Sequence, residues 1–200
     1  MIEIISVDDH EMISLGLERV FSQTKDIRVC HFCKTKAELV PFIESKAAEE
    51  LKNMLAMLDI KLEEGSGFEV ADFLLEKGVK CLMYSSFSNA GYVIKTMEHK
   101  ITGFITKNAP QPEILEAVHA VFSGETYIQK NLLPDMMFVS GILVTLTKKE
   151  RELVDLMSEH LSNEELAQRL AVSKRTIENY VSRIFDKFNV KNRYELERYL

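Results

Sequence analysis

The chain of 200 residues has few cysteines and no long apolar run, and each absence excludes a class of protein. Three cysteines, an odd number in a sequence that opens without an export signal, argue against a disulfide framework. No apolar run approaches the roughly 20 residues that a membrane-spanning helix requires. The opening Met-Ile-Glu-Ile-Ile is short and acidic, unlike a secretory signal, so we expect a cytoplasmic protein.

The composition is that of an ordinary folded protein. Apolar residues make up 46% of the chain and charged residues 28%, which does not fit a disordered chain. The length suffices for one large domain or two small ones, each with its own core, and no internal repeat or low-complexity tract is visible.

Two of the cysteines have the CxxC spacing of many metal sites, in Cys30-His-Phe-Cys33. They lie in the stretch 27–33, which is predicted to be a strand. Residues three apart on a strand point to opposite faces, so these two thiols are not expected to bind the same ion. We interpret both as core and strand-packing residues.

Charge is distributed unevenly along the chain. Residues 1–145 contain 14 Lys and Arg against 21 Asp and Glu, a net charge of −7, whereas residues 146–200 contain 11 against 10, a net charge of +1. Within 168–193 there are 7 basic and 2 acidic residues. This pattern fits a regulatory module followed by an anion-binding one, although a solvated helix face would give the same local excess.

The first 122 residues alternate five short apolar runs with five helical patterns. We predict strands at 3–7, 27–33, 54–59, 79–85 and 102–105, and helices at 11–23, 35–51, 67–77, 89–99 and 110–122. The alternation predicts an α/β fold, a five-stranded parallel sheet that is doubly wound, with helices on both faces. Residues 123–145 are predicted to be a linker, because no sustained period follows Ser123-Gly-Glu, but they are apolar enough that part of the linker should pack on a neighbour.

The remaining residues, 146–200, are predicted to form a small all-α domain. Its four helices are expected at 148–159, 163–170, 174–188 and 192–200. The first two open with the capping boxes Thr147-Lys-Lys-Glu150 and Ser162-Asn-Glu-Glu165, and Ser173 is a candidate N-cap of the third. The turn Ala171-Val-Ser173 between the second and third helices is the signature of a helix-turn-helix. If that turn needs a left-handed backbone at its first residue, alanine there costs about 1 kcal/mol relative to glycine.

Four of the predicted strands end abruptly in polar, reactive residues. The strand ends carry the pair Asp8-Asp9, then Asp59, Ser85 and Lys107. In a parallel sheet of this kind the ligand site lies beyond the carboxyl ends of the strands. Three carboxylates, a hydroxyl and an ammonium are therefore expected to converge in one pocket.

Carboxylates gathered this closely are unfavourable unless a cation lies among them. Oxygen ligands with remaining water positions favour Mg²⁺, and a carboxylate neutralised in this way can accept a phosphoryl group. Lys107 would then balance the phosphate oxygens, and Ser85 would donate a hydrogen bond to them. A purely structural interpretation stays open, in which Asp8 and Asp9 cap the first helix and Lys107 pairs with them.

Residues 1–122 resemble the receiver domain of a bacterial two-component response regulator, which has a flavodoxin-like fold. Val7-Asp-Asp-His10 is similar to the acidic-pair segment of that family, and Asp59-Ile-Lys-Leu, followed by Gly67, to its phosphoacceptor segment. The resemblance implies that Asp59 accepts the phosphoryl group. It also implies that Mg²⁺ is bound by Asp8, Asp9, Asp59 and the backbone carbonyl of Lys61.

The same resemblance assigns three further roles. Lys107 matches the family's pocket lysine, Ser85 its switch hydroxyl and Phe104 its switch aromatic residue. Lys61 and Phe87 occupy positions that modulate the lifetime of the acyl phosphate in the family. The chain departs from the family where prolines are usual, at Glu11, Glu63 and Asn108, but no departure removes a reactive group.

The last part, Leu146 to Leu200, resembles the LuxR-type DNA-binding domain of NarL/FixJ-type regulators. The segments that carry the resemblance are Leu146-Thr-Lys-Lys-Glu150, Leu161-Ser-Asn-Glu-Glu-Leu-Ala167 and Val172-Ser-Lys-Arg-Thr-Ile-Glu-Asn-Tyr-Val-Ser182. The third segment would be the recognition helix in the major groove. Its base-reading candidates are Glu178, Asn179 and Ser182, since carboxylates, amides and hydroxyls can pair with base edges. The candidates for phosphate contacts and the exposed basic face are Lys174, Arg175, Thr176, Arg183, Lys187 and Arg193.

We therefore predict a transcription regulator that a sensor histidine kinase phosphorylates on Asp59 with Mg²⁺, and that binds promoter DNA as a homodimer. It would be no enzyme beyond its own phosphoryl transfer and slow dephosphorylation. The substituted prolines motivate an alternative, a DNA-binding regulator that works without phosphorylation and whose receiver serves dimerisation or partner binding. An enzyme with an aspartyl-phosphate intermediate would need a separate general acid or substrate cap, and neither is visible.

Overall fold

The computed structural model describes residues 1–157 and 161–200. Its contacts divide the chain into two compact units. Unit 1 comprises Met1–Ser88 and Lys95–Lys130, and unit 2 comprises Asn89–Ile94 and Asn131–Leu200. Over the described ranges, no helix has both the length and the apolar character needed to cross a membrane. The domain boundaries expected at 122 and 146 stay predictions.

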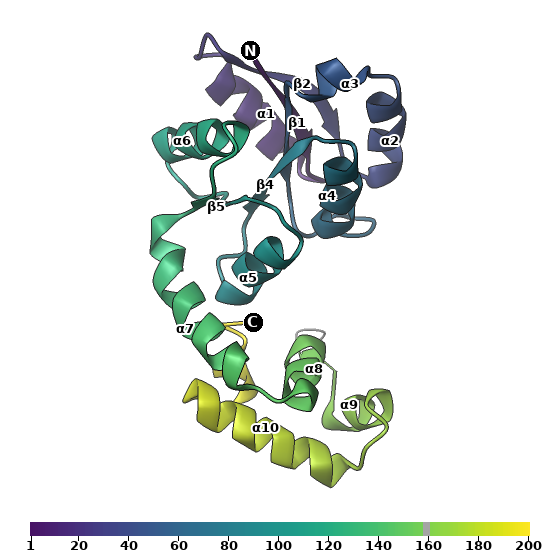
Figure 1. Ribbon diagram of the computed structural model, residues 1–200, viewed down its shortest axis with the longest axis vertical. Helices are drawn as coiled ribbons and strands as arrows, with labels where there is room; N and C mark the ends of the chain where they lie inside the picture. Colours follow the sequence, from purple (N-terminus) through teal and green to yellow (C-terminus); the bar gives the residue numbers. More distant parts are fainter. Residues whose placement is uncertain (158–160) are drawn as a thin grey trace. The chain divides into compact units, whose positions relative to one another are not determined.

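A parallel sheet forms the centre of unit 1 (Figure 1). Its strand order in the described part of the chain is β2-β1-β3-β4-β5-β6. The bounds are β1 Ile2–Val7, β2 Ile27–Cys33, β3 Met54–Leu58, β4 Lys80–Ser85, β5 Gly103–Thr106 and β6 Tyr127–Ile128. The parallel sheet with its first five strands is confirmed, and β6 is an addition that the sequence pattern did not reveal.

Helices follow the strands and cover both faces of the sheet, with α1 and α6 on one side and α2 and α4 on the other (Figure 1). Their bounds are α1 Glu11–Phe21, α2 Lys36–Glu44, α3 Ala48–Leu51, α4 Gly67–Glu76, α5 Ala90–Glu98 and α6 Gln111–Phe122. The single helix predicted at 35–51 is in fact two. The hydroxyl of Ser45 donates to the carbonyl of Phe42 at 2.7 Å, and this local bond competes with continuation of the helix.

The core of unit 1 lies between the sheet and these helices. Successive side chains of β1 point to opposite faces of the sheet, and Ile4 lies on the face covered by α1 and α6. It packs in one cluster with Leu17 of α1 and Val118 of α6, and all three side chains are buried. Strand β3 is buried along its whole length, as expected for a central strand of a sheet covered on both faces. This burial holds the carboxyl ends of the central strands in place.

The predicted linker 123–145 is largely regular structure. Strand β6 pairs with β5 through Gly103 opposite Tyr127 and Phe104 opposite Ile128. A 3₁₀ turn, Lys130–Leu132, leads into helix α7, Leu133–Thr145. Two residues are too short a strand for an alternation pattern to show. The sequence did not predict helix α7, because apolar residues lie on all its sides and therefore show no helical period. Val139 is buried, for example, whereas Val144 is 86% exposed.

Unit 2 contains the predicted helix-turn-helix. Its helices are α7 and then α8 Lys148–Met157, α9 Asn163–Arg169, α10 Lys174–Phe188 and α11 Arg193–Leu196. The predicted end of the first tail helix, at 158–159, lies outside the described residues. The final helix is shorter than the predicted 192–200 and ends at Leu196. Side chains of Leu153, Leu166, Ile177, Ile184 and Leu196 are fully buried in a common core.

The predicted caps are present at the helix starts. In the Ser162 box, the hydroxyl accepts from the Glu165 N–H at 3.3 Å and the Glu165 carboxylate accepts from the Ser162 N–H at 2.7 Å. The Thr147 and Glu150 pair makes the same reciprocal contacts. The Ser173 hydroxyl accepts from the Thr176 N–H at 3.1 Å and opens α10. These bonds satisfy N–H groups that have no partner within their own helix.

Ala171, in the turn between α9 and α10, has a φ of 51°, which is the left-handed region. Alanine is strained there and glycine is not. We expect Ala171→Gly to raise the free energy of unfolding of unit 2 by up to about 1 kcal/mol, measured by urea denaturation. Gln168→Gly, on the exposed face of α9, is the control and should lower it by a similar amount. Destabilisation by both substitutions would contradict the strain argument.

Candidate functional site

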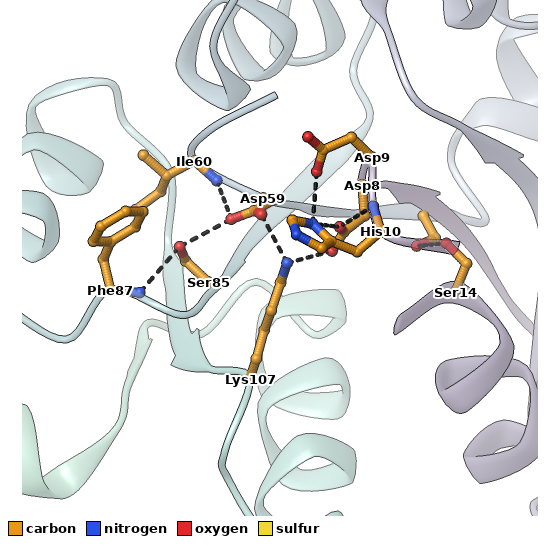
Figure 2. A network of polar contacts seen from close by, with 10 residues as sticks. Asp8, Asp9, His10, Ser14, Asp59, Ile60, Ser85, Phe87 and Lys107 are labelled. Atoms are coloured by element: carbon orange, nitrogen blue, oxygen red, sulfur yellow. Dashed lines mark hydrogen bonds and ion pairs between the residues drawn. The ribbon is translucent and has the colours of Figure 1, made fainter. Parts of the chain in front are cut away.

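The carboxyl ends of β1, β3, β4 and β5 bring the predicted pocket residues together (Figure 2). Asp8 and Asp9 follow β1, Asp59 follows β3, Ser85 is the last residue of β4, and Lys107 follows β5. Asp8 is 4% exposed, Asp59 6% and Ser85 0%. Five polar side chains predicted from strand ends are thus gathered in one largely buried site.

Asp59 is held through both of its carboxylate oxygens. Its Oδ1 accepts from the Ile60 N–H at 2.7 Å and from the Ser85 hydroxyl at 2.9 Å. Its Oδ2 accepts from Lys107 Nζ at 2.7 Å. These contacts fix the orientation of the carboxylate toward the pocket, as Figure 2 shows.

Lys107 joins two buried acids. Its Nζ lies 2.6 Å from Asp8 Oδ2 and 2.7 Å from Asp59 Oδ2, and its side chain is 8% exposed. The backbone N–H of Lys107 donates to the carbonyl of Ser85 at 2.8 Å, which secures the start of the loop after β5. The ammonium thereby offsets the repulsion between two desolvated carboxylates.

Gly67, predicted to follow the Asp59 segment, is required by a close backbone approach. A Cβ at this position would stand 1.9 Å from the carbonyl oxygen of Asp59. The Gly67 N–H also donates to the carbonyl of Ile60 at 2.9 Å. Glycine therefore allows the start of α4 to lie directly against the loop that carries Asp59.

The acidic residues of the pocket fit a hard cation. One ligand atom from each of Asp8, Asp9, His10 and Asp59 lies within 4.8 Å of the others. Asp8 Oδ2 and Asp9 Oδ1 are buried and have no hydrogen bond of good geometry, although Lys107 and His10 nitrogens lie within ion-pair distance of them. Carboxylate oxygens with unused lone pairs are the ligands that Mg²⁺ prefers. His10, which contacts Asp9 at 2.7 Å, was not among the predicted ligands.

The two predicted switch residues point inward. Phe104, on β5, has no exposed surface, and the Ser85 hydroxyl already contacts Asp59. Lys61 and Phe87 meet at the edge of the pocket, where Lys61 Nζ lies 4.6 Å from the centroid of the Phe87 ring. The predicted role of the Lys61 carbonyl as a metal ligand stays a prediction.

Helix α10 of unit 2 presents most of the predicted DNA-contacting side chains to solvent. The exposed members are Lys174, Arg175, Glu178, Asn179, Ser182 and Arg183. Thr176 is half-buried beside the N-cap, with its hydroxyl 2.8 Å from that of Ser173. The Lys174 ammonium pairs with Glu164 of α9. The roles of these residues in DNA binding stay predictions.

Two of the predicted phosphate contacts are engaged inside unit 2. Lys187 donates to the buried carboxylate of Glu150 at 2.8 Å and to the carbonyl of Thr145 at 2.9 Å. Arg193 donates to the carbonyls of Leu161 and Met157. Both cations therefore hold helices of the unit together, which competes with a phosphate contact. Sequence reasoning missed Glu150 as a buried acid, because its role as a capping residue already accounted for it.

The Lys187 ammonium and the Thr147 N–H hold the pKa of Glu150 down to about 2. A carboxylate with a depressed pKa stabilises the fold above its ordinary pKa, and this contribution disappears as the pH falls toward 2. Lys187→Met should raise the Glu150 pKa, measured by carbon NMR. It should also lower the free energy of unfolding at neutral pH by about 1.5–3 kcal/mol, the range for a hydrogen bond to a charged group. Lys191→Met, at an exposed lysine, is the charge-matched control, and an equal loss in both variants would contradict the ion pair's role.

Comparison with known families gives two matches. The family described as response regulator receiver domain matches residues 4–119, and the family described as bacterial regulatory proteins, luxR family, matches residues 144–200. The first match alone covers more than half of the chain. Together they correspond to the two modules predicted from the strand ends and from the helix-turn-helix.

Similar proteins cover nearly the whole chain. The transcriptional regulatory protein DesR of Bacillus subtilis is 26% identical over 195 residues, 98% of this chain and 94% of the relative. The oxygen regulatory protein NreC of Staphylococcus aureus is 28% identical over 214 residues, 98% of this chain and 95% of the relative. The RcsB–DNA complex has a TM-score of 0.71 at 18% identity, with 99% of this chain and 96% of that chain covered, and shows the same fold. The chain belongs to the response regulators of the NarL/FixJ type, in which a receiver domain precedes a LuxR-type DNA-binding domain.

Proposed function

We propose that this response regulator is switched by phosphorylation of Asp59 and then binds promoter DNA through α10. The observation that carries the proposal is the Asp59 carboxylate, held by Ser85 and Lys107 beside the acidic pair at the end of β1. A histidine kinase would supply the phosphoryl group. A carboxylate oxygen of Asp59 forms the new bond to phosphorus, the phosphorus–nitrogen bond to the kinase imidazole breaks, and that imidazole takes up a proton.

Mg²⁺ would be held by Asp8, Asp9, Asp59 and the Lys61 carbonyl. When bound, the cation neutralises charge on the phosphoryl oxygens. The Lys107 ammonium would move from the two carboxylates to a phosphoryl oxygen, and the Ser85 hydroxyl would donate a hydrogen bond to another. The receiver would catalyse only this transfer and the slow hydrolysis of the acyl phosphate, in which water takes the phosphoryl group and the Asp59 carboxylate is restored.

Control of DNA binding would follow from a shift in population. The phosphorylated state is favoured to the extent that the phosphoryl group binds one arrangement of Ser85, Phe104 and Lys107 better than another. Unit 2 would then bind as a homodimer, with two α10 helices reading half-sites about one helical turn apart. Asn179 and Glu178 are exposed on the helix that would enter the groove, and Arg175 would contact a phosphate.

A second candidate is a regulator that binds DNA without phosphorylation and uses its receiver for dimerisation or partner binding. A specific observation favours it. The Lys107 ammonium lies within ion-pair distance of both Asp8 and Asp59, so a side chain of the receiver itself offsets the charge of these two carboxylates. The two candidates differ in whether a phosphoryl group changes DNA affinity.

Treatment with a small phosphoryl donor and Mg²⁺ should add the mass of one phosphoryl group to the intact protein, and Asp59→Asn should abolish the gain. DNA affinity, measured by fluorescence anisotropy, should rise about 5- to 150-fold, the usual range of allosteric coupling. Asp72→Asn, a substitution on the exposed face of α4, should leave both results unchanged. A normal mass gain with unaltered DNA affinity would support the second candidate instead.

Substitutions on α10 should separate the reading of bases from the binding of phosphates. Asn179→Ala should reduce discrimination at one base pair by about 1–3 kcal/mol, because a paired amide is lost. Arg175→Ala should weaken binding to all sequences and reduce the salt dependence by about one phosphate contact. Arg198→Ala, exposed beyond α11, is the matched arginine control for binding titrations at several salt concentrations. Equal losses on all sequences from Asn179→Ala would contradict its base-reading role.

A further inference from the structure

Gln129 is a buried polar residue that the proposed chemistry does not use. It follows β6 directly and is 6% exposed. Its side-chain Oε1 accepts from the backbone N–H of Thr106 at 3.0 Å and lies 2.7 Å from the Thr106 hydroxyl. Its Nε2 donates to Glu113 of α6 at 3.2 Å. A buried amide with this many partners has a defined orientation.

The contacts of Gln129 continue the hydrogen bonding between β5 and β6 as far as Thr106, next to the pocket residue Lys107. Its backbone N–H donates to the carbonyl of Phe104 at 3.1 Å, and because β6 ends at Ile128, the Gln129 side chain supplies the next acceptor for β5. That acceptor binds Thr106, the residue before Lys107. Lys107 in turn contacts Asp59. One hydrogen-bonded residue therefore separates Gln129 from the pocket ammonium.

The Thr106 hydroxyl has two acceptors within reach. It is within hydrogen-bond distance of Gln129 Oε1 and also of Asn108 Oδ1, on the far side of Lys107 in sequence. A hydroxyl has one proton, so it donates to one of these acceptors at a time. A shift of Lys107 would move the backbone between Thr106 and Asn108 and so bias the choice. Coupling between sites requires an element of this kind, with alternatives that both sites can bias.

We propose that Gln129 is a positioning residue that acts through Thr106 to hold Lys107, and that reports the occupancy of the Asp59 site to the segment 127–132. The inference rests on the proposed phosphorylation of Asp59. It assigns a role to β6, because this strand places Gln129 one residue before the 3₁₀ turn that leads to α7. Occupancy of the pocket would thus change the hydrogen bonds at the beginning of that turn.

The test compares amide hydrogen exchange of 127–132 in the full chain with and without Mg²⁺ and beryllofluoride, a tetrahedral mimic of an acyl phosphate. In the wild type, occupancy should change exchange in this segment at least about 5-fold, the lower end of ordinary allosteric coupling. In Gln129→Leu, beryllofluoride should still bind, but the change should fall below about 2-fold because the connection to Thr106 is lost. Gln111→Leu, at an exposed glutamine of α6, is the control.

An exchange of the amide and the carboxylate between positions 129 and 113 distinguishes loss of the positioning contact from loss of packing. Gln129→Glu keeps the acceptor for Thr106 but places a carboxylate against Glu113, so it should lose the response. Adding Glu113→Gln restores a donor opposite the new carboxylate and should restore the response. This pair decides the matter even if Gln129→Leu does not fold.

An unchanged exchange response in Gln129→Leu, or no recovery in the double variant, would overturn the inference while leaving phosphorylation of Asp59 intact. A wild type that binds beryllofluoride without any change at 127–132 would also overturn it alone. A wild type that does not bind beryllofluoride would overturn the proposed function and this inference together.

Discussion

The ammonium of Lys107, between the buried carboxylates of Asp8 and Asp59, is the interaction on which the receiver pocket depends. Two desolvated acids at the ends of adjacent strands repel each other, and the fold tolerates them only while a cation is near. This requirement makes the pocket responsive. Whatever brings or takes positive charge changes the contacts of Lys107, and Lys107 is the first residue after β5. The charge balance inside the pocket therefore affects the backbone at the end of β5, where Lys107 lies.

The backbone around Lys107 is supported from two directions. Its own N–H is bound by Ser85 on one side, and the N–H of Thr106 is bound by Gln129 on the other. Strand β6 supplies the second support, although it has only two residues. The strand adds the buried Tyr127 to the core of unit 1 and places the Gln129 side chain beside Thr106. The predicted linker thus contains a strand of the sheet of unit 1, and the proposed positioning role of Gln129 would act through it.

Two of the basic side chains of unit 2 form contacts inside the unit. Lys187 holds the buried Glu150, and Arg193 binds two backbone carbonyls. Of the predicted phosphate contacts, Lys174, Arg175 and Arg183 remain exposed on α10, together with the polar candidates for base contacts. A recognition helix needs a rigid support, because a base contact depends on placement of the side chain. The ion pair between Lys187 and Glu150 holds α10 against α8 and so supports the helix that would carry the DNA contacts.

The sequence by itself determined the elements whose physics is local. Apolar runs ending in Asp8, Asp59, Ser85 and Lys107 predicted the sheet and its pocket, and the capping boxes predicted the helix starts of the tail. Both signals can be read from residues that are close in the chain. Only the tertiary structure decided which residues far apart in the sequence come into contact. The strand β6, the contact of Gln129 with Thr106, and the pairing of Lys187 with Glu150 join residues 23 to 37 positions apart. No periodicity marks such partners, since their pairing depends on which polar groups the fold buries next to one another.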